Sequence, residues 1–125
     1  MPLAILNPDV NFHLIDSIGK KIKVVEGVVQ SLGLKNVKAS KVRSEELKGK
    51  YDYITARAVA RAITFHHWVG HLKNTKSSYE KAGIYYLKGG DVKEELQELK
   101  RPYKVWEISE FYRDEFFETK KVVHF

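Results

Sequence analysis

Apolar and polar residues follow two different periods along the chain, and these periods predict helices and strands in turn. Apolar side chains at helical spacing between Ile22 and Leu32 predict a helix that Ser17 caps and Gly33 ends. Pro2–Leu6 has the pattern of a helix end, because Asn7 and Pro8 follow it. The other predicted elements are strands at Asn11–Ile15, Val37–Val42, Tyr51–Thr55 and Gly83–Leu87, and helices at Ala58–Leu72 and Val92–Leu99.

The connections and the C-terminal part complete this pattern. Ser44–Leu47 is predicted as a turn or a single helical turn, Asn74–Ala82 as a polar loop, and Lys88–Asp91 as a turn. Helices that alternate with strands favour an α/β layered fold with a mostly parallel sheet. Tyr103–Ile108 and Lys120–Phe125 are rich in β-formers with no long helix between them, so they are predicted to pair antiparallel.

Composition limits the class of protein. A length of 125 residues favours one domain over residues 1–125, and a hydrophobic content of 43% favours a packed core. The sequence has no cysteine, which excludes disulfides and thiolate metal sites. No apolar run approaches the roughly 20 residues that a membrane span needs, and the N-terminus does not resemble a signal peptide. We therefore expect a cytoplasmic protein that does not bind membranes.

The net charge of +6 is concentrated in one segment. Residues 19–50 contain nine Lys and Arg side chains against three Glu side chains, so this segment alone accounts for the excess. A local excess of positive charge suits a polyanion such as RNA, although a solvated lysine-rich surface gives the same pattern.

Among the candidate functional residues, Asp16 has the position that is most informative about function. It follows the apolar strand Asn11–Ile15 and precedes a basic helix. In nucleotide-binding α/β folds, an acid at the carboxyl end of the second strand accepts hydrogen bonds from a ribose diol. The alternative is a helix-terminal acid that only interacts with the helix dipole. The pattern favours the nucleotide interpretation.

Several phrases, in order along the chain, resemble a known family. They are PLAI (Pro2–Ile5), HLIDSIGKKIK (His13–Lys23), LGLKNV (Leu32–Val37), VRSEE (Val42–Glu46), YDYITARAVA (Tyr51–Ala60) and YLKGG (Tyr86–Gly90). Together they are similar to the small-subunit ribosomal RNA guanine-N7 methyltransferase G family, also known as glucose-inhibited division protein B. The resemblance covers essentially the whole chain.

The resemblance implies a Rossmann-like methyltransferase that binds S-adenosylmethionine and methylates N7 of a guanine in 16S rRNA. It also implies the strand order 3-2-1-4-5-7-6. Family members are longer at the N-terminus, where they carry the first strand and a glycine-rich loop. We therefore expect a partial domain that lacks the central strand 1, and an activity that is incomplete in this chain.

The resemblance also assigns roles to individual residues. Asp16, Ser44, Glu45 and Arg57 are expected on the cofactor side, although a solvent-exposed helix start at Ser44 and an ion pair of Arg57 are the alternatives. On the basis of charge, Lys20, Lys21, Arg43 and Lys88 are the candidates for holding RNA phosphates, and the alternative for each lysine is a solvated surface side chain. Four aromatic residues, Tyr85, Tyr86, Phe65 and Trp68, are interpreted as core residues rather than base-stacking platforms.

No catalytic residue and no metal site are predicted. Guanine N7 already presents a lone pair, so methyl transfer to it requires no general base. Alignment of the reacting atoms is expected to supply most of the rate acceleration. His67 and His71 are one helical turn apart, but the sequence offers no third ligand and no HExxH pattern.

The absence of strand 1 predicts a structural consequence. It leaves Asn11–Ile15 and Tyr51–Thr55 separated by two strand spacings, roughly 9.6 Å. Either these two strands close up and pair directly, or a second copy of the chain covers the open edges in a homo-oligomer.

Two other functions remain as alternatives. A non-catalytic RNA-binding module would use the basic face of residues 19–50. A nicotinamide- or flavin-dependent oxidoreductase fragment would also use an acid on the second strand, but the later phrases do not fit it.

Overall fold

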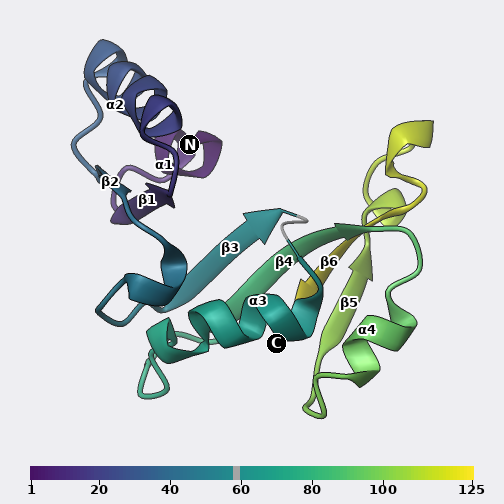
Figure 1. Ribbon diagram of the computed structural model, residues 1–125. Helices are drawn as coiled ribbons and strands as arrows, with labels where there is room; N and C mark the ends of the chain where they lie inside the picture. Colours follow the sequence, from purple (N-terminus) through teal and green to yellow (C-terminus); the bar gives the residue numbers. More distant parts are fainter. Residues whose placement is uncertain (58–59) are drawn as a thin grey trace. The chain divides into compact units, whose positions relative to one another are not determined.

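The computed structural model describes residues 1–57 and 60–125, and it divides into two compact units. Unit 1 is Met1–Leu47 and unit 2 is Lys48–Phe125 (Figure 1). Within the described ranges, no helix combines the length and the hydropathy needed to cross a bilayer.

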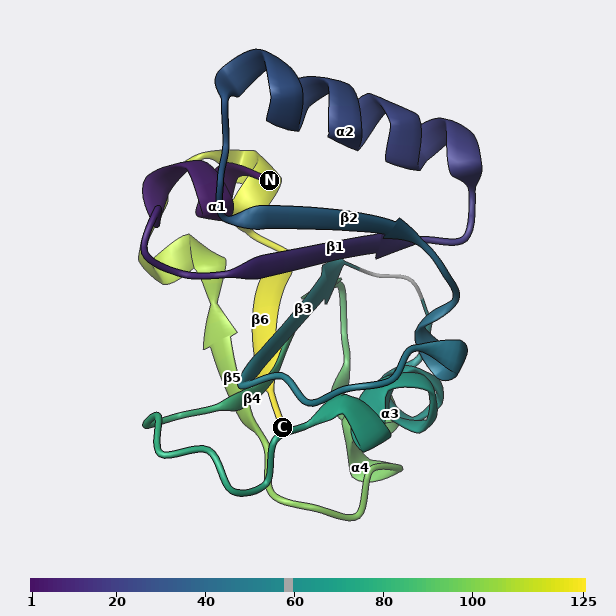
Figure 2. The same ribbon diagram turned by 90° about the vertical axis from the view of Figure 1, so that its left-hand side faces the viewer.

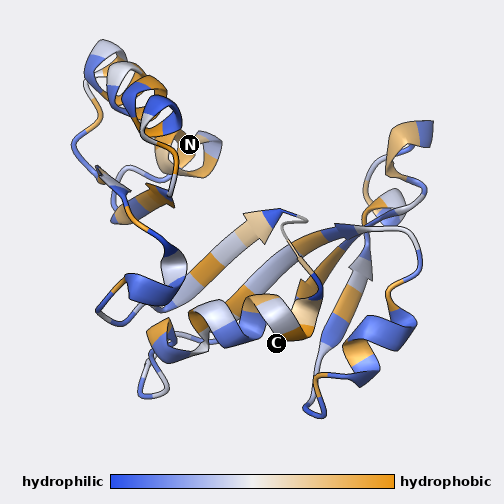
Figure 3. Cartoon of the chain, in the orientation of Figure 1, coloured by the Kyte–Doolittle hydropathy of each residue, from blue (hydrophilic) through white to orange (hydrophobic). Residues whose placement is uncertain are grey.

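Unit 1 consists of a two-stranded parallel sheet with two helices. Its elements are α1 (Pro2–Leu6), β1 (Phe12–Asp16), α2 (Gly19–Leu32), β2 (Val37–Lys41) and the 3-10 helix η1 (Ser44–Glu46). Figure 3 shows hydrophobic and hydrophilic residues alternating around α2. Ile22 is buried on this helix, as its helical spacing predicts.

The two ends of α2 differ in how well the sequence predicts them. Gly33 follows the helix in the left-handed conformation with φ 62°, and its N–H bonds to carbonyls of the last turn, so the predicted stop is confirmed. The predicted Ser17 cap is wrong. Ile18 occupies the N-cap position, and the Asp16 carboxylate accepts its N–H at 2.9 Å. Asp16 precedes Ser17 by one residue, and its carboxylate binds a backbone N–H of the turn that Ser17 was predicted to cap.

Asn36 ties α1 to the sheet of unit 1. Its Nδ2 lies 3.0 Å from the Ala4 carbonyl oxygen, 3.0 Å from that of Asn7 and 2.9 Å from that of Val10. These three carbonyls lie in α1 and the loop to β1, and Asn36 immediately precedes β2. One side chain therefore substitutes for backbone partners that this irregular loop lacks.

Unit 2 is a four-stranded mixed sheet with two helices. Its elements are β3 (Tyr53–Arg57), α3 (Ala62–Val69), the 3-10 helix η2 (Gly70–Leu72), β4 (Gly83–Gly89), α4 (Lys93–Gln97), β5 (Lys104–Glu107), η3 (Ile108–Glu110), η4 (Glu115–Phe117) and β6 (Lys120–His124). The strand order is β3-β4-β6-β5. Strands β3 and β4 are parallel, and β6 is antiparallel to both of its neighbours.

The core of unit 2 lies between the sheet and its helices. Helices α3 and α4 cover the same face of the sheet (Figures 1 and 2). Tyr86 and Ile84 of β4 and Val123 of β6 are fully buried there, and the Phe65 ring of α3 lies 4.6 Å from the Tyr86 ring. The interpretation as core residues is confirmed for Tyr86 and Phe65, whereas Tyr85 and Trp68 are only partly buried.

The strand order agrees with the order that the family resemblance implies. Removing strand 1 from 3-2-1-4-5-7-6 leaves the sets 3-2 and 4-5-7-6, which match β2-β1 and β3-β4-β6-β5. The α/β fold and the antiparallel C-terminal pair are therefore confirmed. The direct pairing of the strands at 11–15 and 51–55 is wrong, because β1 and β3 belong to separate sheets. Cover by a second copy stays a prediction.

Three predicted boundaries are also corrected. Strand β3 begins at Tyr53 rather than Tyr51, since Tyr51 instead forms an isolated bridge with Lys73. Strand β4 extends through Gly89, because Lys88 and Gly89 pair with β6, so only Gly90 and Asp91 remain in the predicted turn. The helix predicted at 58–72 starts at Ala62 and continues as η2 to Leu72, and residues 58–59 lie outside the described residues.

Replacing Asn36 with Ala is expected to destabilise unit 1 selectively. The substitution removes the shared donor of three carbonyls, which should cost about 1–3 kcal/mol of unfolding free energy. Urea unfolding and amide exchange in α1 measure the effect, with Asn11→Ala as the matched control on the exposed loop. Equal unfolding midpoints for the two variants would contradict this role of Asn36.

Candidate functional site

The carboxyl edge of the β1–β2 sheet brings together the cofactor residues predicted in unit 1. The strands run parallel with Asp16 opposite Lys41, and the Val42 N–H donates to the Asp16 carbonyl oxygen at 3.0 Å. Because η1 begins at Ser44, three residues after β2 ends, Ser44 and Glu45 follow the strand end beside Asp16. Ligands of α/β sheets bind outside such carboxyl edges.

The Asp16 carboxylate is accessible and only partly used by the protein. Its side chain is 34% exposed, its Oδ1 accepts the Ile18 N–H, and its Oδ2 lies 3.9 Å from the Lys21 Nζ. A carboxylate offers about four acceptor sites, so acceptor capacity remains for a diol. The helix-terminal role weighed as the alternative is present as well, and it fixes the orientation of the carboxylate.

The residues that follow the ends of β1 and β2 include polar, acidic and basic side chains. The Ser44 hydroxyl donates to the Glu45 Oε2 at 3.1 Å, and Glu45 is exposed. Lys20 and Lys21 lie in the first turn of α2, a turn without an acidic residue. Positive charge at a helix N-terminus opposes the helix dipole, so this arrangement costs helix stability. Such a local conflict is typical of a functional surface.

Arg57 lies at the carboxyl edge of the parallel strands in unit 2. It is the last residue of β3, opposite Leu87 of the parallel strand β4, and its side chain is exposed. The sequence places Arg57 after this strand, whereas it ends the strand. Arg57 and Asp16 belong to different units, so their expected proximity stays a prediction.

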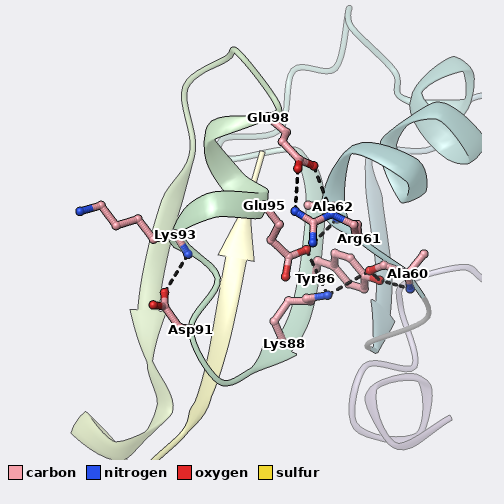
Figure 4. A network of polar contacts seen from close by, with 9 residues as sticks. All are labelled: Ala60, Arg61, Ala62, Tyr86, Lys88, Asp91, Lys93, Glu95 and Glu98. Carbon is pink, nitrogen blue, oxygen red and sulfur yellow. Dashed lines mark hydrogen bonds and ion pairs between the residues drawn. The ribbon is translucent and has the colours of Figure 1, made fainter.

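Lys88 lies in different surroundings from those expected of an RNA-binding lysine. Its side chain is only 12% exposed, and its Nζ forms an ion pair with the Glu95 Oε2 at 3.2 Å (Figure 4). The next residue before it in the strand, Leu87, faces the opposite side of the sheet with Arg57. This geometry does not support a contact between Lys88 and RNA phosphates.

The sequence analysis missed the polar network around Lys88. Figure 4 shows side chains of β4 and α4 converging on Ala60, Arg61 and Ala62 at the start of α3. The Arg61 guanidinium forms two hydrogen bonds with the Glu98 carboxylate, and these bonds raise the pKa of Arg61 above its ordinary value. Acidic residues in the short helix α4 were the only sequence signal.

Other parts of the molecule contribute less to a site. A shallow surface pocket of unit 1 lies at the opposite edge from Asp16, near Gly33 and Val37. Among residues 1–57 and 60–125, no group of three or more His, Asp or Glu side chains has the arrangement of a metal site.

A comparison with solved structures agrees with the fold described above. A solved rRNA methylase from Streptococcus thermophilus superposes with a TM-score of 0.59 over 90% of this chain and 70% of its own, at 8% sequence identity. That likeness concerns the fold alone.

Curated relatives match the chain more closely in sequence. Ribosomal RNA small subunit methyltransferase G of Flavobacterium psychrophilum is 53% identical over 99% of this chain, and that of Christiangramia forsetii is 50% identical over 99%. The corresponding protein of Phocaeicola vulgatus is 39% identical over 99% of the chain. The chain spans 59–60% of the length of these three relatives. The family model described as rRNA small subunit methyltransferase G matches residues 1–122, so the chain belongs to this family.

Proposed function

We propose that this chain is the cofactor- and RNA-binding part of an S-adenosylmethionine-dependent methyltransferase that acts on N7 of a guanine in 16S rRNA. The observation that carries the proposal is the accessible Asp16 carboxylate at the end of β1, which pairs in parallel with β2, the strand that precedes Ser44 and Glu45. The family membership and the methyltransferase-like strand order support it. The substrate places the proposed activity in the cytoplasm.

The residues at the carboxyl edge of β1 and β2 fit the adenosyl half of the cofactor. When bound, S-adenosylmethionine supplies a methyl group that its sulfonium activates. Asp16 accepts hydrogen bonds from the ribose hydroxyls, while Ser44 and Glu45 contact the adenosyl part. The methionine end is assigned to the glycine-rich loop that the family resemblance implies.

The residues of this chain need to bind and align the reactants, and they need not move a proton. S-adenosylmethionine would supply the methyl group, and guanine N7 would need no general base because it already presents a lone pair. Arg57, at the end of β3, pairs with a phosphate or the guanine edge. Lys20, Lys21 and Arg43 hold RNA phosphates on unit 1, where all three side chains are exposed.

A non-catalytic RNA-binding module is the second candidate. The lysines in the first turn of α2 favour it, because their positions suit an anion whether or not a cofactor is present. In this case, RNA affinity would not depend on S-adenosylmethionine. A titration of RNA with and without the cofactor therefore separates the two functions.

Replacing Asp16 with Asn is expected to weaken cofactor binding roughly ten- to hundredfold. The amide keeps an oxygen that can accept the Ile18 N–H but loses the charge that strengthens hydrogen bonds to a diol. Calorimetry with S-adenosylmethionine measures the affinity, and Asp9→Asn on the exposed loop before β1 is the matched control.

The proposal would be contradicted in either of two ways. Equal affinities of the Asp16→Asn and Asp9→Asn variants would remove Asp16 from the site. An unsubstituted chain without measurable affinity would show that these residues do not themselves hold the cofactor.

Replacing Lys20 and Lys21 together with Gln is expected to reduce the salt dependence of RNA binding. Each phosphate contact contributes about −0.7 to −0.9 to the slope of log K against log salt, so the slope should become shallower by roughly 1.4–1.8. Filter binding with small-subunit RNA over a salt series measures it. The control pair is Lys35→Gln with Lys38→Gln, whose slope should change less; equal changes in both pairs would indicate nonspecific binding.

A further inference from the structure

Lys88 and Glu95 form an ion pair that is largely shielded from solvent. Lys88 comes from β4 and Glu95 from α4, and each side chain is 12% exposed. Their charged atoms lie 3.2 Å apart (Figure 4). Charges in such surroundings are screened far less than charges on the surface, so their mutual geometry is strongly determined.

Lys88 and Glu95 bind backbone atoms of Ala60 and Ala62 in addition to each other. The Lys88 Nζ donates to the Ala60 carbonyl oxygen at 3.0 Å. The Glu95 Oε2, the same oxygen that pairs with Lys88, accepts the Ala62 N–H at 2.8 Å. Two charged side chains from different elements therefore fix two nearby points on the chain between β3 and α3.

Tyr86, two residues before Lys88 on the same face of β4, binds the same backbone segment. Its hydroxyl donates to the Ala60 carbonyl oxygen at 2.5 Å and accepts the Ala60 N–H at 2.7 Å. The Lys88 Nζ also lies 5.0 Å from the centroid of the Tyr86 ring. The Ala60 carbonyl oxygen thus receives donors from both Tyr86 and Lys88, and the backbone of this one residue makes three of the contacts.

The two held residues follow Arg57 along the chain. Arg57 ends β3, Ala60 and Ala62 are the held residues, and α3 starts at Ala62. Its first N–H groups need partners from outside the helix, and Glu95 supplies one of them. The carboxyl end of β3, where Arg57 lies, is part of the ligand edge of the sheet.

The geometry points to Lys88 and Glu95 as positioning residues for Ala60 and the start of α3, through which they set the placement of Arg57 toward the RNA substrate. This inference rests on the proposed function. Neither residue touches the substrate. A displacement of about 1 Å at a reacting centre can lower the rate about a hundredfold, so a remote pair that fixes this segment has a large effect on catalysis.

Amide exchange of the unmodified chain and its variants tests the positioning directly. Lys88→Met removes the charge and the donor but keeps an aliphatic side chain, and exchange at Ala60 and Ala62 is expected to accelerate about tenfold. Lys88→Arg keeps a cation and should restore most of the protection. Glu95→Gln keeps an acceptor for the Ala62 N–H and provides a milder variant should Lys88→Met fail to fold.

The matched control is Lys121→Met on the neighbouring strand β6. Lys121 forms a comparable ion pair with Glu107, at 3.5 Å, and its side chain is 16% exposed. Its removal should leave exchange at Ala60 and Ala62 unchanged. The inference is overturned if the Lys88→Met and Glu95→Gln variants leave these two amides unchanged, or if exchange rises uniformly across unit 2 as it would for a merely structural pair.

Methyl transfer to small-subunit RNA supplies the second measurement. Lys88→Met is expected to lower kcat roughly ten- to hundredfold while the KM for S-adenosylmethionine stays within about threefold, because the Asp16 edge is untouched. Faster exchange without any fall in kcat would overturn the positioning role. An unsubstituted chain without methyl transfer agrees with the incomplete activity expected from the sequence, and the exchange result then decides the inference.

Discussion

The parallel pairing of β1 with β2 is the constraint on which the account of this protein depends. Parallel strands must end at the same edge, so Asp16 and the segment after Lys41 are brought together although 24 residues separate their strand ends. The connecting helix α2 begins at this edge and carries Lys20 and Lys21 in its first turn. A carboxylate, a short 3-10 helix and two cations therefore gather at one edge, as the α/β topology requires.

Parallel pairing also shapes unit 2, where it gives the basic residues Arg57 and Lys88 different surroundings. Strands β3 and β4 are parallel, and Arg57 lies opposite Leu87. Because side chains alternate between the faces of a strand, Lys88 points to the face covered by the helices and meets Glu95 there. One basic residue at this edge is exposed, and the other belongs to an internal network that holds the adjoining chain (Figure 4).

Local signals in the sequence predict most of the elements. The left-handed glycine at position 33 and the helix-to-strand alternation are properties of neighbouring residues, and both are confirmed. The resemblance predicts the strand order, including the two sets that remain without strand 1.

Features that depend on distant partners could not be predicted in this way. The role of Lys88 requires the extension of β4 by its pairing with β6 and the position of Glu95 in α4. The role of Asn36 requires three carbonyls of a loop that lies 26 to 32 residues earlier in the chain. Ser17 is a good N-cap residue by type, but the Asp16 carboxylate reaches the first free N–H instead.

The central claim is that the carboxyl edge of β1 and β2 receives the adenosyl part of the cofactor. The most direct test is a titration of the isotopically labelled chain with S-adenosylmethionine, followed by the amide chemical shifts of each residue. The account predicts the largest changes at Ile18, Ser44 and Glu45. Changes concentrated at the opposite edge, around Gly33 and Val37, would contradict it.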